Sequence, residues 1–97
     1  MNPLYARQLI HTDTMTVARA FMKKGCEVPE HSHPNEQVSM IEKGALQFTM
    51  DGVAKIARPG DVVRIASNLR HSAVAVEDSI MVEIFSPPRS EWIKPAK

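Results

Sequence analysis

The sequence predicts an all-β domain, either a sandwich or a barrel of antiparallel strands. Short runs rich in Val, Ile, Phe, Met and Thr recur between turn signals, and a spacing of about eight to twelve residues between such runs is typical of these two architectures. Two segments have the composition of tight turns between strands. A helix is expected at only one place, a single turn near the C-terminus. Chemical groups must therefore be carried by strands and strand ends.

Seven runs are expected to form the strands: residues 14–22, 37–44, 45–50, 53–57, 61–66, 72–77 and 79–85. Asp51-Gly52 predicts a hairpin turn between two of them, because Gly accepts the positive φ that a primed turn requires. The segment 58–61, Arg-Pro-Gly-Asp, predicts a second turn, since Pro fixes φ and Gly relieves the following position. The helical turn is expected at 90–93 and is ended by Pro95.

Length and composition limit the class of protein. The 97 residues predict a single domain, 1–97, that buries only roughly 60–65% of its unfolded surface, so a homodimer is favoured. The formal net charge is +1, with acids and bases interspersed, which indicates neither nucleic-acid nor membrane partners. Cys26 is the single cysteine, so no intrachain disulfide is possible. No signal segment and no apolar run of about 20 residues is found, and a cytoplasmic protein is expected.

Residues 29–37 read PEHSHPNEQ and hold two of the four histidines. On a strand, His31 and His33 point to the same face about 6.5 Å apart, and such a pair can chelate a metal. If the extended backbone continues through Pro34, Gln37 shares that face and Glu36 points away. Alone, the pair is explained better by two solvent-facing histidines on an edge strand.

A wider pattern surrounds this pair. Residues 25–44, GCEVPEHSHPNEQVSMIEKG, fit G-x5-H-x-H-x3-E-x6-G, with Gln37 at the acidic position. Residues 60–75, GDVVRIASNLRHSAVA, fit G-x5-P-x-G-x2-H-x3-N more loosely. Together they resemble the two motifs of the cupin superfamily, which implies a cupin-type antiparallel β-barrel, also described as a double-stranded β-helix or jelly roll.

The second motif departs from the family pattern at Ala66, Asn68 and Ala75, where the pattern has proline, glycine and asparagine. Asn is able to take the left-handed conformation in place of glycine, so the turn before His71 is expected to form. The N-terminal region before residue 14 is short for a cupin. It is expected to be either a strand swapped across a dimer or a frayed arm.

The resemblance implies that His31, His33 and His71 are ligands of one divalent metal ion: Ni, Zn, Fe, Mn or Cu. Counting from His33 and from Gly44 places Gln37, not Glu36, at the fourth ligand position. Alternatively, Gln37 only hydrogen-bonds a ligand histidine. Three neutral imidazoles and a neutral amide leave the charge of the metal uncompensated, so such a site favours a small anionic substrate.

The segment MVEIFSPPRSEW, residues 81–92, is the second informative region. Alternation places Met81, Glu83 and Phe85 on one face of a strand. That face either lines the barrel interior, where Glu83 would be a carboxylate near the metal, or faces water, which alternation alone favours. Arg89 follows two prolines and is expected either to bind a substrate carboxylate or to form an ion pair, for instance with Glu91.

This segment resembles that of small cupins related to the pectin-degradation proteins that linearise 4,5-unsaturated uronates. Their pattern D-x-F-x3-R is matched by Glu83, Phe85 and Arg89, with Glu in place of the usual Asp. The resemblance implies that Glu83 moves a proton, Phe85 excludes water and Arg89 anchors a carboxylate. The alternatives are another metal-cupin isomerase or dioxygenase, or a cupin that binds a small molecule without turnover.

The remaining singled-out residues are given structural roles. His11 is expected to be an exposed turn residue, and Cys26 a small buried thiol. Arg64 is expected to point out of the barrel, whereas the direction of Arg19 stays open.

Overall fold

The protein is described here by a computed structural model that covers residues 3–92. In these residues the chain forms nine strands and one 3₁₀ turn: β1 (Tyr5–His11), β2 (Thr16–Met22), β3 (Glu27–His31), β4 (Glu36–Lys43), β5 (Leu46–Met50), β6 (Val53–Ala57), β7 (Val62–Ile65), β8 (His71–Ala75), β9 (Ser79–Ser86) and η1 (Ser90–Trp92). No helix of this part of the chain is long and apolar enough to cross a membrane.

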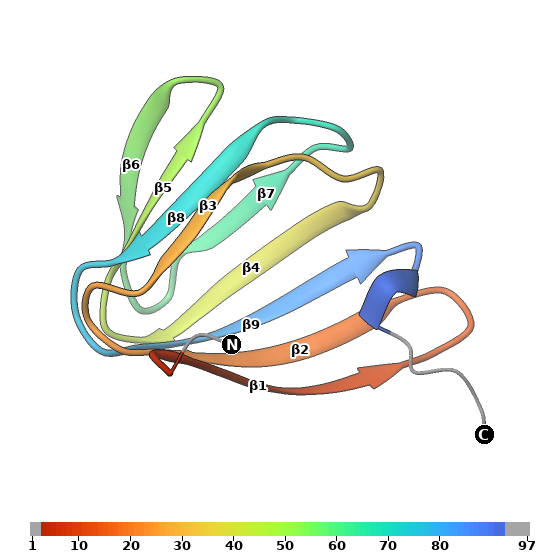
Figure 1. The fold of residues 1–97 in the computed structure, drawn as a ribbon, viewed down its shortest axis with the longest axis horizontal. Coiled ribbons are helices and arrows are strands. Elements are labelled where there is room, and N and C mark those ends of the chain that lie inside the picture. Colours follow the sequence, from red (N-terminus) through yellow and green to blue (C-terminus); the bar gives the residue numbers. More distant parts are fainter. Residues whose placement is uncertain (1–2, 93–97) are drawn as a thin grey trace.

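The strands form two antiparallel sheets that face each other as two layers (Figure 1). One sheet has the order β1-β2-β9-β4-β7 and the other β3-β8-β5-β6. Neighbouring strands are mostly far apart in sequence, as β9 lies between β2 and β4. The predicted all-β antiparallel barrel is therefore confirmed, and distant chain segments meet inside it.

All seven predicted runs contain strands, but two strands were not predicted as such. β3 is short and contains Pro29, and most residues of β1 are exposed. Neither strand therefore has the run of apolar residues by which the other strands were predicted. β1 pairs with β2 of the same chain along its whole length, from Tyr5 opposite Met22 to His11 opposite Thr16. The frayed-arm alternative is therefore wrong, and the expected dimer stays a prediction.

The predicted turns form where they were expected. Asp51 and Gly52 have φ values of 50° and 80°, as the two central residues of a type I′ hairpin turn require. At 58–61, the Asp61 N–H donates to the Arg58 carbonyl at 2.9 Å, and the Arg58 N–H donates to Asp61 Oδ2 at 2.8 Å. The predicted helical turn is present as η1; Ile93 and Pro95 lie outside the described residues.

Two backbone positions with positive φ hold the motif segments in place. Gly44 has a φ of 83°, and a Cβ atom there would lie 2.2 Å from the Asp78 carbonyl oxygen, so only glycine fits. Asn68 has a φ of 64°, which confirms that it takes the place of the family glycine. Its N–H donates to the His33 carbonyl at 2.8 Å, so the two motifs meet directly.

The barrel interior is divided into an apolar part and a polar part. Large apolar side chains such as Met22, Leu46 and Ile65 are at most 2% exposed and form one cluster with the predicted buried thiol of Cys26. The buried polar residues include His33, Asn35, Gln37, Ser39, His71, Glu83 and Arg89. Since polar groups are buried without cost only when they have partners, this second group marks the candidate site.

Candidate metal centre

Three histidines come together at the polar end of the barrel. His31 ends β3, His71 begins β8, and the two are paired residues in adjacent strands. His33 lies in the loop before β4. One ligating nitrogen from each ring lies within 4.8 Å of the others. The sequence placed His33 on a strand, which is wrong, but the alternation continues past the strand end: His33 and Gln37 are buried and Glu36 is exposed.

Each ring is oriented by a backbone carbonyl. The Nδ1 atoms contact carbonyl oxygens in the pairs His31–Pro29 at 2.8 Å, His33–Asn35 at 3.0 Å and His71–Leu69 at 2.8 Å. A carbonyl only accepts, so each Nδ1 donates and each neutral ring keeps a lone pair on Nε2. Burial lowers the pKa of His33 and of His71, which favours these neutral forms. The Nε2 atom of His71 is buried with no hydrogen-bond partner in residues 3–92.

Gln37 is held with its amide oxygen toward the histidines. Its Nε2 donates to Ser39 Oγ at 3.0 Å and to Glu83 Oε2 at 2.9 Å. Its Oε1 therefore lies 3.2 Å from His33 Nε2. With the His33 proton on Nδ1, this contact joins two acceptors, which is unfavourable unless a cation lies beside them.

The side chains present fit a divalent transition metal. Three imidazole nitrogens and one amide oxygen are ligands that such ions accept, and the partnerless Nε2 of His71 is the kind of buried polar atom that a metal satisfies. Asn35 supports the loop, because its Nδ2 donates to the Pro87 carbonyl at 2.5 Å. The donor set suits several metals and does not select one.

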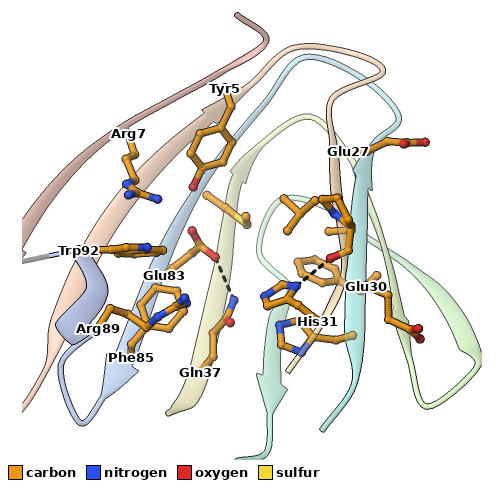
Figure 2. A pocket seen from close by; sticks show the side chains of 16 residues that line it. Tyr5, Arg7, Glu27, Glu30, His31, Gln37, Glu83, Phe85, Arg89 and Trp92 are labelled. Carbon is orange, nitrogen blue, oxygen red and sulfur yellow. Dashed lines mark hydrogen bonds between the residues drawn. The ribbon is translucent and has the colours of Figure 1, made fainter. Parts of the chain in front are cut away.

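A cavity of about 470 Å³ opens beside the histidines. Figure 2 shows His31 on one side of it and Gln37 and Glu83 on the other. Tyr5 and Arg7 reach it from β1, and further lining comes from β9, from η1 and from the segment between them. A small molecule in this cavity would contact the histidine cluster and the β9 side chains at the same time.

Glu83 faces this cavity and is only 6% exposed. Met81, Glu83 and Phe85 share the inward face of β9, so the solvent-facing alternative is wrong. It failed because a charged residue on a strand usually faces water, whereas here the Gln37 amide and the cavity accommodate it. Burial raises the pKa of Glu83 to about 7, although the charges of Arg89 and Arg7 lower it. Such a carboxyl group can both take up and release a proton near neutral pH.

Arg89 forms the predicted ion pair with Glu91, and its binding of a substrate carboxylate stays a prediction. Its guanidinium donates from Nε and Nη2 to the same oxygen of Glu91, at 2.8 and 2.5 Å. Its side chain is nevertheless only 11% exposed and lines the cavity. The backbone N–H of Arg89 donates to Thr16 Oγ1 at 2.9 Å, and the guanidinium lies 5.0 Å from the centre of the Phe85 ring. The Arg89 hydrogen bonds lower the pKa of Glu91.

Several lining residues were not assigned to the site from the sequence, among them Tyr5, Arg7 and Trp92. The first two were missed because β1 was not predicted. The only available signal was their spacing, since Tyr5 and Arg7 are two residues apart and so share one strand face. The Trp92 ring packs against Phe85 with 5.1 Å between ring centres, a contact that depends on η1 folding back over β9.

The structure also places the other singled-out residues. His11 is wrong as an exposed turn residue: it ends β1, is partly buried, and its Nδ1 lies 2.7 Å from Thr16 Oγ1. Arg64 points outward as predicted and pairs with Glu36 at 2.8 Å. Arg19 also points outward, and it pairs with Glu42 at 2.9 Å.

Comparison with known proteins identifies the family. The family model described as "Cupin domain" matches residues 18–86, well over half of the chain. The chain is a cupin. This agrees with the fold and with the three clustered histidines, since cupins commonly bind a metal.

The cupin resembles pectin degradation proteins in particular. It is 26% identical to the pectin degradation protein KdgF of Dickeya dadantii (strain 3937) over 82 residues, which cover 84% of this chain and 74% of the relative. The structure of KdgF from Halomonas sp. superposes with a TM-score of 0.90 at 26% identity, covering 95% of this chain and 86% of that one.

An RmlC-like cupin from Shewanella frigidimarina NCIMB 400 is equally similar. Its crystal structure has a TM-score of 0.90 and 26% identity, with 96% of this cupin and 85% of that chain covered. The barrel of this protein is therefore shared almost completely with solved cupins.

Proposed function

We propose that this cupin is a metal-dependent enzyme that opens the ring of 4,5-unsaturated uronates to the linear keto form. The observation that carries the proposal is the hydrogen bond from the Gln37 amide to Glu83. It couples the group at the fourth metal-ligand position to a buried acid with a pKa of about 7. The relative named for pectin degradation supports the substrate class.

His31, His33, His71 and Gln37 would hold the metal. When bound, the metal supplies a Lewis acid that stabilises negative charge on a substrate oxygen. All four ligands are neutral, so no ligand carboxylate offsets the positive charge of the metal. Such a site favours an anionic substrate such as a uronate.

Glu83 supplies the proton transfer. Ring opening takes the proton from the hemiacetal hydroxyl, breaks the bond between the ring oxygen and the anomeric carbon, and leaves an enol or enolate. Returning a proton to the alkene carbon gives the ketone, so the net change is an isomerisation. Because the pKa of Glu83 is raised to about 7, its carboxylate is able to take up the first proton and deliver the second.

Phe85 and Arg89 complete the β9 side of the cavity. Phe85 is 1% exposed and lies beside His33, with 5.8 Å between ring centres, so it keeps water from this part of the site. The Arg89 guanidinium has five N–H donors, and its Nε and Nη2 atoms donate to Glu91. The remaining donors are available to a substrate carboxylate.

The direct test incubates metal-loaded protein with 4,5-unsaturated galacturonate and follows the loss of the double-bond absorbance. Acceleration over buffer is expected, and it should be lost when a chelator removes the metal. No acceleration with any of the candidate metals would sink the proposal. Oxygen consumption by an iron-loaded sample would instead indicate a dioxygenase.

A further inference from the structure

The β1 side of the cavity carries a cation, Arg7, whose charge acts on the nearby Glu83 carboxylate without a direct ion pair in residues 3–92. Arg7 lines the cavity. The arginines with a carboxylate partner in residues 3–92 are Arg19, Arg64, Arg70 and Arg89. Arg7 forms no ion pair within this part of the chain. A guanidinium that lines a cavity without a direct ion-pair partner can donate to an anionic group.

Strand register explains how Arg7 reaches the cavity. Arg7 lies opposite Ala20 on β2, and Ala20 lies opposite Met81 on β9. The next inward position of β2 is Ala18, opposite Glu83. Both alanines are at most 1% exposed, and their short side chains leave room above the sheet. The Arg7 side chain therefore extends toward Trp92 instead of being blocked by β2.

Arg7 and Arg89 lie against the same aromatic ring. Their guanidinium carbons are 3.7 and 4.3 Å from the centre of the Trp92 ring system. Figure 2 shows the indole edge-on, with Arg7 on one face and Arg89 on the other. Contacts with an aromatic face hold a guanidinium without neutralising its charge. Of the two cations, Arg89 forms an ion pair with Glu91, whereas Arg7 forms none within residues 3–92.

The opposite wall of the cavity has the opposite charge. Glu27 and Glu30 line it from β3. Glu30 is paired with Arg70 at 2.9 Å, and no ion pair of Glu27 occurs in residues 3–92. A ligand carboxylate is therefore expected to bind at the Arg7 and Arg89 end of the cavity and away from Glu27.

We propose that Arg7 is the residue that recognises the substrate carboxylate, acting with Arg89 as a two-arginine clamp around Trp92. The choice of a uronate as the ligand rests on the proposed function. The positions of Arg7, Arg89 and Trp92 do not depend on it. The Tyr5 hydroxyl lies on the same strand face and lines the same cavity. Arg7 thus orients the uronate with its carboxylate toward β1.

Binding of saturated galacturonate tests the assignment without any turnover. Isothermal titration calorimetry on the metal-loaded protein compares the wild type with Arg7→Gln, Arg7→Lys and Arg19→Gln. Arg7→Gln is expected to weaken binding about 10- to 100-fold, as loss of a charged hydrogen-bond partner implies, and Arg7→Lys less. Arg19→Gln is the matched control, because it removes the same charge from the outer face of the same sheet.

Three results would overturn the assignment: no galacturonate binding by the wild type, no loss in Arg7→Gln, or an equal loss in Arg19→Gln. Metal content by elemental analysis should be equal in all four proteins, and a loss confined to Arg7→Gln would mean that Arg7 only supports the fold. Turnover separates the two proposals. If Arg7→Gln opens the ring as fast as the wild type, the proposed activity stands and the role of Arg7 is refuted. If binding depends on Arg7 but no turnover occurs, the role of Arg7 stands and the proposed activity is refuted.

Discussion

On the histidine side of the cavity, each ring is oriented by a carbonyl two residues away. On the other side, the Glu83 carboxylate and the Arg89 backbone N–H bond to groups 46 and 73 residues away. The first arrangement needs only short segments in the right conformation. The second needs the five-stranded sheet to be assembled, because β2, β4 and β9 must be adjacent. The two sides should therefore respond differently to substitution, with metal binding and proton transfer lost separately.

Substitution of His71 by Ala should have the largest effect, because it removes a ligand whose Nε2 has no other partner in residues 3–92. We expect loss of stoichiometric metal and, with it, of all metal-dependent activity. Elemental analysis of the purified protein measures the first. His11→Ala is the control, since His11 lies outside the cavity lining. Unchanged metal occupancy in His71→Ala would refute the ligand assignment.

Substitution of Glu83 by Gln should separate chemistry from metal binding. The amide still accepts the Gln37 hydrogen bond but carries no proton between substrate atoms. Ring opening is expected to slow about 10²- to 10⁴-fold, with metal content unchanged. The control Glu42→Gln removes an exposed acid that pairs with Arg19. Equal slowing in both variants would contradict a catalytic role for Glu83.

The same variant should change how stability depends on pH in the metal-free protein. The pKa of Glu83 is about 7 in the fold, above its ordinary value of 4.5, so the folded state holds this proton more tightly than the unfolded state. The wild type should therefore lose stability as pH rises from about 4.5 to about 7. Relative to it, Glu83→Gln should gain up to roughly 3 kcal/mol over this range.

Urea unfolding in the presence of a chelator measures both proteins across that range. Taking the difference between them removes most of the contribution of His33 and His71, whose own pKa values are lowered by burial. Parallel stability curves for the two proteins would contradict the raised pKa.

Substitution of Thr16 by Val should give the smallest of these effects. At nearly constant volume, it removes the acceptor of the Arg89 backbone N–H and the contact with His11 Nδ1. The buried Arg89 donor is left unsatisfied at a cost of about 1–3 kcal/mol. Thermal unfolding should show the loss, and metal content should not change. Thr49→Val, on β5, is the comparison. Loss of metal in Thr16→Val would show that the two sides of the cavity are coupled after all.

The difference between the two sides also explains what could be predicted from the sequence. His31, His33 and Gln37 are close in sequence, so alternation and motif spacing were enough to place them on one face. Glu83 was harder, because its direction depends on a partner on another strand. The acid, the aromatic and the arginine were recognised only through the resemblance, which reflects the same long-range packing.

Arg7 and Trp92 could not be placed at the site in this way. Arg7 lies on a mostly exposed strand with little apolar alternation, and its contact with Trp92 joins the two ends of the described chain. Neither composition nor local spacing contains information on such a contact. By contrast, the turn at Asp51-Gly52 is a local property of two residues and was predicted correctly.

The hydrogen bond from the Asn68 N–H to the His33 carbonyl has a consequence for how the protein meets its metal. Together with the pairing of His31 and His71, it brings the two ends of the chain segment between the motifs together as part of the fold. The configurational freedom of that segment is given up in folding, not in binding. Metal uptake should therefore leave the far-ultraviolet circular dichroism of the protein almost unchanged, as expected for a preformed metal site.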